Sequence, residues 1–161
     1  WTVSPKDISK PFLLELFFDL FLEKGCGKGT IQEILTAVCG GDKARGIIRT
    51  TNIGNPTSTA ALLGKQLAID PDASGRKTDA GIFNSIVSNE PVEIKVLYVN
   101  EASTRLGIVV WRNFNDQPSA SGGGIEGMGR RMVNVEIKIR PTKPYPELKG
   151  KLLKEVSGIF Q

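Results

Sequence analysis

Apolar residues occur along this chain in short runs that alternate with segments of helical spacing. Residues 16–22 (LFFDLFL) are apolar apart from Asp19, as in a parallel strand buried on both faces. In residues 30–38 (TIQEILTAV) the apolar positions recur with the period of an amphipathic helix, and Gly40 and Gly41 then end it. The pattern predicts a strand, a glycine-containing turn and a helix near the start of the chain.

The alternation continues through the rest of the sequence. The next predicted elements are a strand at 67–69, a helix at 79–87, one arm of a β-hairpin at 92–99, a strand at 106–111, a strand at 132–139 and an amphipathic helix at 147–160. The glycine-rich segment 119–129 is predicted to be a flexible surface loop. Strands alternating with helices predict an α/β fold in three layers around a mostly parallel sheet. Residues 1–161 are interpreted as one domain, cut from a longer protein because the chain begins with Trp1.

Composition excludes several classes of function. The chain contains no histidine, which excludes Ser-His-Asp and Cys-His catalysis and zinc sites that use histidine. Two cysteines, Cys26 and Cys39, are too few for a disulfide framework and favour a reducing cytoplasm. No apolar run is long enough to span a membrane. The net charge of +4 is compatible with a polyanionic partner. Any chemistry must use carboxylates, Lys, Arg, Asn, hydroxyls or backbone amides.

The turn between the first predicted strand and helix carries the clearest candidate chemistry. It reads Gly25-Cys26-Gly27-Lys28-Gly29-Thr30. Glycines in such a turn let backbone amides face phosphate oxygens, the helix N-terminus adds partial positive charge, and Lys28 reaches the β- and γ-phosphates of ATP. Thr30 would join the Mg²⁺ shell. The match departs from the usual phosphate loop at Leu22, which replaces a glycine, and at Gly29, which replaces Ser or Thr.

A second strand end supplies carboxylates. Asp70 and Asp72 follow the run 67–69 and are separated by Pro71. Hydrolysis of a nucleoside triphosphate needs a group that holds Mg²⁺ and another that orients the attacking water. Asp70 and Asp72 are therefore candidate catalytic and metal-binding residues. The competing interpretation is an Asp-Pro turn that only ends the strand.

Three further motifs follow in order. They are Asn89-Glu90-Pro91 with Lys95 behind it, Asn115-Asp116-Gln117-Pro118, and Arg130-Arg131. Together with the phosphate loop and the two aspartates, this order resembles superfamily 3 helicases, specifically the C-terminal ATPase of phage, plasmid and poxvirus primase–helicases. The resemblance spans most of the chain. It implies an AAA+-like P-loop NTPase fold with a β-hairpin insertion, and a fragment of a longer primase–helicase.

The resemblance also implies a function and roles for single residues. The function would be that of an ATP-dependent DNA helicase motor, using Mg²⁺ at the subunit interfaces of a homo-oligomeric ring, a hexamer by family analogy, and moving on single-stranded DNA. Asn115 would act as a sensor at the γ-phosphate, with Asn113 as the competing choice. Arg130 or Arg131 would be an arginine finger toward the neighbouring subunit, and Lys95 would contact DNA. The location would be a bacterial, archaeal or viral-host cytoplasm, without a membrane partner.

Two other functions stay open at the level of the sequence. A nucleotide kinase shares the phosphate loop, but the segment between Lys28 and Asp70 contains no arginine-rich lid. A non-catalytic nucleotide- or DNA-binding module would be consistent with Leu22 and Gly29. The later motifs also have plain structural interpretations, as a turn asparagine, an exposed arginine pair and a lysine that protects an edge strand.

Overall fold

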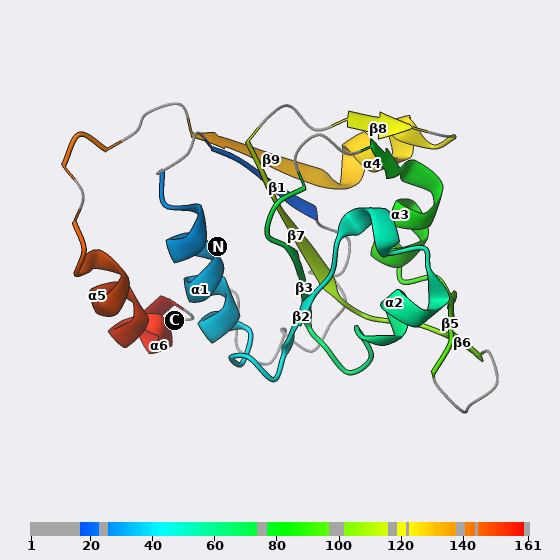
Figure 1. Cartoon of the computed structure of the whole chain (residues 1–161), viewed down its shortest axis with the longest axis horizontal. Helices are drawn as coiled ribbons and strands as arrows, with labels where there is room; N and C mark the ends of the chain where they lie inside the picture. The colour runs from blue at the N-terminus through cyan, green and yellow to red at the C-terminus, as the bar shows by residue number, and fades with distance from the viewer. Residues whose placement is uncertain are drawn as a thin grey trace.

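The centre of the fold is a parallel sheet. The computed structural model describes residues 17–22, 26–73, 77–96, 102–115, 119–121, 123–137, 141–143 and 145–159. Within these ranges, five strands lie in the order β2-β3-β7-β1-β9, and every neighbouring pair is parallel (Figure 1). Their bounds are β1 (Phe17–Leu22), β2 (Arg45–Ile47), β3 (Leu67–Asp70), β7 (Val109–Phe114) and β9 (Met132–Ile137). The predicted α/β class with a parallel sheet is confirmed.

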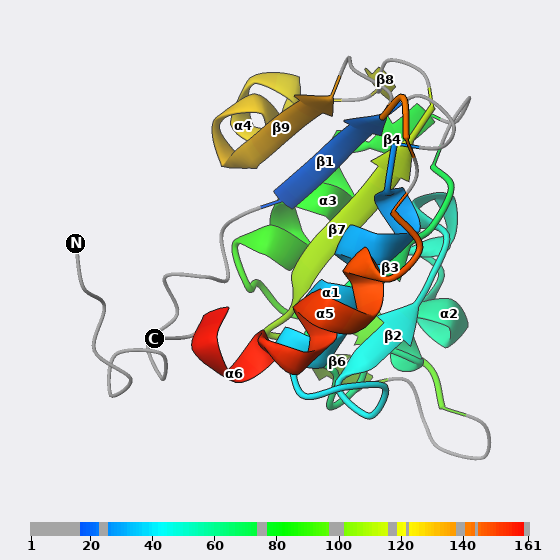
Figure 2. The same ribbon diagram turned by 90° about the vertical axis from the view of Figure 1, so that its left-hand side faces the viewer.

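Helices lie on both sides of this sheet (Figures 1 and 2). One side carries α1 (Lys28–Val38), α5 (Leu148–Lys154) and α6 (Val156–Ile159). The other side carries α2 (Pro56–Ala60), α3 (Ala80–Val87) and α4 (Ile125–Arg131). A 3₁₀ helix, η3 (Thr50–Asn52), precedes α2 in the chain. Among the helices described, none is long and apolar enough to cross a bilayer.

Two small strand pairs complete the described structure. Strands β4 (Lys77–Asp79) and β8 (Ser119–Ser121) pair in parallel. Strands β5 (Val92–Ile94) and β6 (Ala102–Thr104) pair antiparallel, which confirms the hairpin that begins at Val92. Lys95 and Val96 of the predicted arm are not in the strand, and its remaining residues, 97–99, and the turn at Asn100 and Glu101 lie outside the described residues.

The connections that follow the neighbouring strands β1 and β7 run in opposite directions along the sheet, so the direction of the chain reverses between them. From β1 the chain passes through α1 to β2 at one edge of the sheet and then returns through β3 and β7. The connection from β7 to β9 then steps over β1. In open α/β sheets, such a reversal leaves a crevice at the carboxyl ends of the strands.

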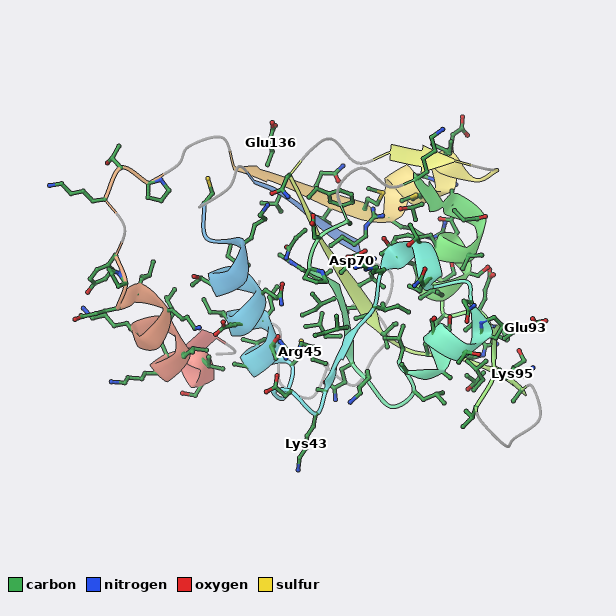
Figure 3. The ribbon with its side chains drawn as sticks, in the orientation of Figure 1. Lys43, Arg45, Asp70, Glu93, Lys95 and Glu136 are labelled. Carbon is green, nitrogen blue, oxygen red and sulfur yellow. The ribbon has the colours of Figure 1, made fainter. Side chains whose placement is uncertain are left out.

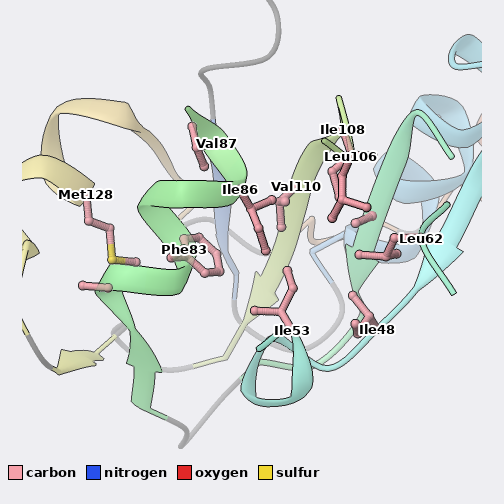
Figure 4. Packing of buried hydrophobic residues seen from close by; sticks show 12 residues of the cluster. Ile48, Ile53, Leu62, Phe83, Ile86, Val87, Leu106, Ile108, Val110 and Met128 are labelled. Atoms are coloured by element: carbon pink, nitrogen blue, oxygen red, sulfur yellow. The ribbon is translucent and has the colours of Figure 1, made fainter. Parts of the chain in front are cut away.

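Two apolar clusters hold the helices to the sheet. The larger one packs around Phe83 of α3, Leu62 and Val110, and Figure 4 shows it between α3, β7 and the segment around Ile53. The smaller one gathers Cys26, Leu67, Ile69 and Trp111, with Ile31 and Leu35 of α1 packed against it. Neighbouring strand residues point to opposite faces, so Val110 and Trp111 enter different clusters. Trp111 is thereby a core residue.

An arginine lies in the middle of the sheet. Arg112 of β7 is fully buried, and its guanidinium carbon lies 4.4 Å from the ring centre of Phe83 and 4.9 Å from that of Phe114. Its Nη1 donates to Thr78 Oγ1 at 2.8 Å. Stacking on aromatic faces and hydrogen bonding offset the cost of removing the guanidinium from water.

Residues 119–129 correct one prediction. They were predicted to be a flexible loop, but they contain β8 and most of α4. Gly124, with φ of 93°, caps the start of α4, and its carbonyl accepts a hydrogen bond from Asn84 Nδ2 at 2.9 Å. Met128 is buried in the larger cluster. The glycines therefore allow a close helix contact here, which composition alone cannot distinguish from a loop.

Other boundaries differ less. The strand predicted at 106–111 is β7, which begins three residues further along, because Leu106 and Ile108 are buried without pairing in the sheet. Arg130 and Arg131 end α4 and do not open β9. The C-terminal helix is divided at Glu155 into α5 and α6.

We expect Gly46→Ala to destabilise the fold. A Cβ on this buried β2 residue would lie 2.6 Å from Leu62 Cδ2, and Leu62 is fully buried and has little freedom to move. Overpacking of this kind costs about 1–3 kcal/mol. Urea unfolding followed by circular dichroism measures the change.

Gly150→Ala in α5 is the matched control. A Cβ there meets no atom within 4 Å, and alanine is favoured over glycine inside a helix by about 0.8–1.0 kcal/mol. Equal stability of Gly46→Ala and the wild type would contradict the packing described for β2.

Candidate functional site

A cleft of about 500 Å³ opens at the carboxyl end of the sheet. Its lining residues are Gly27, Lys28, Gly29, Thr30, Pro71, Asp72 and Asn115. The first four come from the start of α1, the next two from the turn after β3, and the last from the end of β7. Parallel pairing of β3, β7 and β1 brings these three chain segments to one edge. All of the lining residues except Pro71 were singled out from the sequence.

The start of α1 is shaped to face an anion. Gly27 caps the helix with φ of 94°, a left-handed conformation that glycine adopts without strain. Ile31 N donates to Gly27 O at 3.1 Å and closes the first turn. The first amide groups of a helix have no partner within it, and they carry partial positive charge. The first turn contains no acidic residue, so it would not repel a phosphate.

Lys28 connects this helix to the end of β7. Its Nζ donates to Phe114 O at 3.3 Å and to Asn115 Oδ1. Asn115 Nδ2 in turn donates to Asp72 Oδ1 at 3.4 Å. A cation, an amide and a carboxylate from three separate segments therefore face one another in the cleft.

The two candidate asparagines have different surroundings. Asn113 is 2% exposed, and its Oδ1 accepts from Trp111 Nε1 at 2.8 Å while its Nδ2 donates to Gln32 Oε1 at 2.9 Å. The bond to Gln32 ties β7 to α1. Asn115 lies beyond the end of the strand and lines the cleft. Of the two alternatives, the structure places Asn115 at the site.

The two candidate aspartates are also separated. Asp72 is exposed and lines the cleft. Asp70 is 1% exposed, and its Oδ2 accepts from Thr50 N at 2.7 Å and from Thr50 Oγ1 at 2.8 Å. Thr50 and Gln32 were not found from the sequence, because no local motif links them to residues that lie far along the chain.

The remaining predicted residues lie away from the cleft. Lys95 is exposed beyond β5, where its backbone N donates to Pro56 O at 3.0 Å (Figure 3). Arg130 is exposed, and Arg131 is half-buried with Nη1 donating to Gly127 O at 3.2 Å. Both arginines precede the amino end of β9, which runs parallel to β1. They therefore lie at the amino ends of the strands, whereas the cleft opens at the carboxyl ends. Gly25 lies outside the described residues.

The oxygen donors of the cleft fit Mg²⁺ bound together with a nucleotide. The cleft offers the Thr30 hydroxyl and the Asp72 carboxylate. Magnesium in nucleotide sites is held by one or two carboxylates, phosphate oxygens and water. Over the described residues, no group of three or more His, Cys, Asp or Glu side chains is placed to hold a metal. Thr30 and Asp72 would thus hold the ion only together with phosphate oxygens.

Both cysteines belong to the smaller apolar cluster or pack against it. Cys26 is buried in the smaller cluster, and Cys39 packs against that cluster from the end of α1. Burial raises the pKa of the Cys39 thiol. A raised pKa keeps this thiol protonated at neutral pH, so Cys39 is a packing residue and a poor nucleophile.

Comparisons with known proteins bear on the fold. No protein-family model and no curated protein matches the chain. Among solved structures, it is similar to the A form apo structure of the NrS-1 C-terminal region (305–718), with a TM-score of 0.64 and 14% identity over 90% of this chain and 34% of that chain. Another apo structure of the same region gives a TM-score of 0.66 and 14% identity, over 91% of this chain and 36% of that chain. The chain thus spans about a third of these neighbours, and at this identity the likeness shows the fold alone.

We expect Asn113→Ala and Asn115→Ala to differ in stability. Asn113→Ala removes the hydrogen bonds that this side chain forms with Trp111 Nε1 and Gln32 Oε1, and together these are worth about 1–3 kcal/mol. Asn115→Ala removes a side chain that lines an open cleft and changes the free energy of unfolding by less than about 0.5 kcal/mol.

Urea unfolding followed by tryptophan fluorescence measures both variants. Equal losses in the two would show that Asn113 does not have the interior role that its hydrogen bonds indicate.

Proposed function

We propose that this chain is the ATP-hydrolysing motor domain of a DNA helicase, built on a three-layer, AAA+-like P-loop NTPase core. One observation carries the proposal: Lys28, at the start of α1, shares a cleft with Asn115 and Asp72. Lys28 begins the helix after β1, Asp72 follows the end of β3, and Asn115 follows the end of β7. Phosphate binding needs a cation and backbone amides, and hydrolysis needs groups that orient water.

The residues of the cleft have distinct roles in this proposal. The amides of the first turn of α1 hold the β-phosphate, and Lys28 stabilises charge on the β- and γ-phosphates. Asn115 lies between Lys28 and Asp72, so it would contact the γ-phosphate or the attacking water. Asp72 would accept a hydrogen bond from that water or hold the ion. Mg²⁺, when bound with the nucleotide, neutralises phosphate charge.

The strand order supports this assignment of roles. β7 lies between β1 and β3, so Asn115 at its end is placed between the phosphate turn and the acidic turn. A sensor of the γ-phosphate needs this central position. The fold shared with the NrS-1 C-terminal region is compatible with it.

The positions of the arginines support a site completed by a second subunit. Arg130 and Arg131 lie at the amino ends of the strands, opposite the carboxyl ends where the cleft opens. Within one chain they would not stabilise the γ-phosphate, but from a neighbouring copy they would. An arginine finger of this kind raises turnover roughly 10³–10⁵-fold. The β5–β6 hairpin with Lys95 would contact single-stranded DNA in the centre of the resulting ring.

The proposal is tested by Lys28→Ala. We expect this variant to lose ATP binding and turnover while its melting temperature stays unchanged, because the side chain projects into the cleft. Binding is measured by calorimetry, and phosphate release is measured with and without single-stranded DNA. Lys43→Ala, which removes an exposed lysine outside the cleft, is the matched control and should keep wild-type activity.

The same assays separate the other functions. Stimulation of phosphate release by single-stranded DNA supports the helicase motor. Phosphoryl transfer to a nucleoside monophosphate would identify a kinase, and ATP binding without turnover would identify a non-catalytic module. Wild-type turnover by a folded Lys28→Ala protein would overturn the phosphate-loop assignment.

A mixing experiment tests the shared site. Lys28→Ala subunits lack a phosphate-binding half, and Arg130→Ala/Arg131→Ala subunits lack the finger. We expect each variant alone to be inactive and their mixture to recover part of the turnover. At some interfaces of the mixed assembly, Lys28 of one variant would meet the intact arginines of the other, and such a site is complete. Size-exclusion chromatography with light scattering verifies that the two variants co-assemble. A mixture that co-assembles and stays inactive would contradict catalysis by the neighbour's arginine.

A further inference from the structure

We propose that Thr50 and Asp70 form a positioning pair that fixes the turn carrying Asp72 into the cleft. Asp70 is then a positioning residue and not a ligand of the ion, and Asp72 is the carboxylate that acts at the site. This inference rests on the proposed function for what Asp72 does, but the positioning itself is a property of the chain without nucleotide.

The first argument is the environment of Asp70. Its carboxylate is almost completely buried, and Oδ2 accepts two hydrogen bonds from one residue, Thr50 N at 2.7 Å and Thr50 Oγ1 at 2.8 Å. Both distances are typical of strong bonds to a charged acceptor. A buried carboxylate held by two donors is already satisfied in the folded chain, and a metal ion would have to displace them.

The second argument is the face of the sheet on which Asp70 lies. Ala68 packs in the cluster of α3, and Ile69 packs in the cluster of α1. Because side chains alternate along a strand, Asp70 lies on the same face as Ala68. The phosphate-binding end of α1 lies on the other face. The side chain of Asp70, which is labelled in Figure 3, thus points away from Lys28.

The third argument is the way in which the turn is held. Asp70 Oδ1 accepts from Asp72 N at 3.3 Å. On the far side of the turn, Ala73 N donates to Asn113 O at 2.8 Å, and Ala73 is 1% exposed. The exposed residue Asp72 therefore lies between two fixed points. One of them, Asp70, depends on Thr50 for its own position.

From these three observations, Thr50 affects the site through Asp70 and Asp72, although Thr50 itself does not line the cleft. Thr50 fixes Asp70 Oδ2, Asp70 Oδ1 fixes the backbone of Asp72, and the Asp72 carboxylate accepts from Asn115 Nδ2. Loss of a partner that orients a metal or catalytic ligand typically lowers metal affinity or activity about 10- to 100-fold. The loss of the Thr50 hydroxyl should have an effect of that size.

Thr50→Val is the test, because valine has the shape of threonine without the hydroxyl. Thr50→Ser, which keeps the hydroxyl, is the matched control. The first measurement is the ¹⁵N order parameter of Asp72 in the nucleotide-free protein. We expect a rigid value, about 0.85, in the wild type and in Thr50→Ser, and a fall toward about 0.6 in Thr50→Val.

The second measurement is Mn²⁺ binding in saturating ADP, followed by electron paramagnetic resonance. We expect affinity to fall about 10-fold or more in Thr50→Val, to fall further in Asp72→Asn and to stay at the wild-type level in Thr50→Ser. If Asp70 were itself a ligand, removing the Thr50 hydroxyl would release its Oδ2 from one of its two donors, and Mn²⁺ would bind as tightly as before or more tightly. That result, or an unchanged order parameter for Asp72, would overturn the proposal.

A second variant covers the case in which Thr50→Val does not fold. Asp70→Asn keeps the size of the side chain but places an amide where one carboxylate oxygen accepted, so Asp72 should again become mobile. A wild-type chain that binds neither ADP nor Mn²⁺ would refute the proposed function alone. The order parameter of Asp72 would still decide the positioning pair.

Discussion

Parallel pairing of β1, β7 and β3 is the constraint on which the site depends. The register places Phe114 beside Phe21 and Arg112 beside Asp70, so all three strands end at one edge of the sheet. Everything that lines the cleft follows one of these strand ends. A shift of register in either pair would move Asn115 or Asp72 by a residue and point its side chain to the other face.

The hydrogen bonds of buried polar residues maintain that constraint. Asn113 ties β7 to α1 through Gln32, and Asp70 ties β3 to the segment that begins at Thr50. Arg112 lies between two aromatic rings and holds Thr78. Each of these groups would be costly to leave unpaired in the interior. They hold the strand ends and the first turn of α1 in place, while the residues that face solvent in the cleft carry the proposed chemistry.

The elements around the glycine-containing turn before α1 were predictable because local signals define them. The strand before the turn, α1 and its end at Gly40 and Gly41 follow directly from hydrophobic period and glycine. The segment 119–129 was wrongly predicted because the same glycines suit a loop and a closely packed helix. Whether this segment forms a loop or a helix depends on contacts with Asn84 and on the burial of Met128. Both involve α3, which lies far away in the sequence.

The sequence by itself determined the residue types of the site: a glycine-lined turn with Lys28, two aspartates after a strand, and two asparagines near the end of another. Only the tertiary structure decided which of them share a cleft. Asp72 and Asn115 lie beyond the ends of β3 and β7 and reach the cleft, while Asp70 and Asn113 lie within those strands and are held in the interior. Thr50, the partner of Asp70, lies 20 residues away in the chain. No sequence motif links two residues at this separation, so their pairing can be seen only in the folded structure.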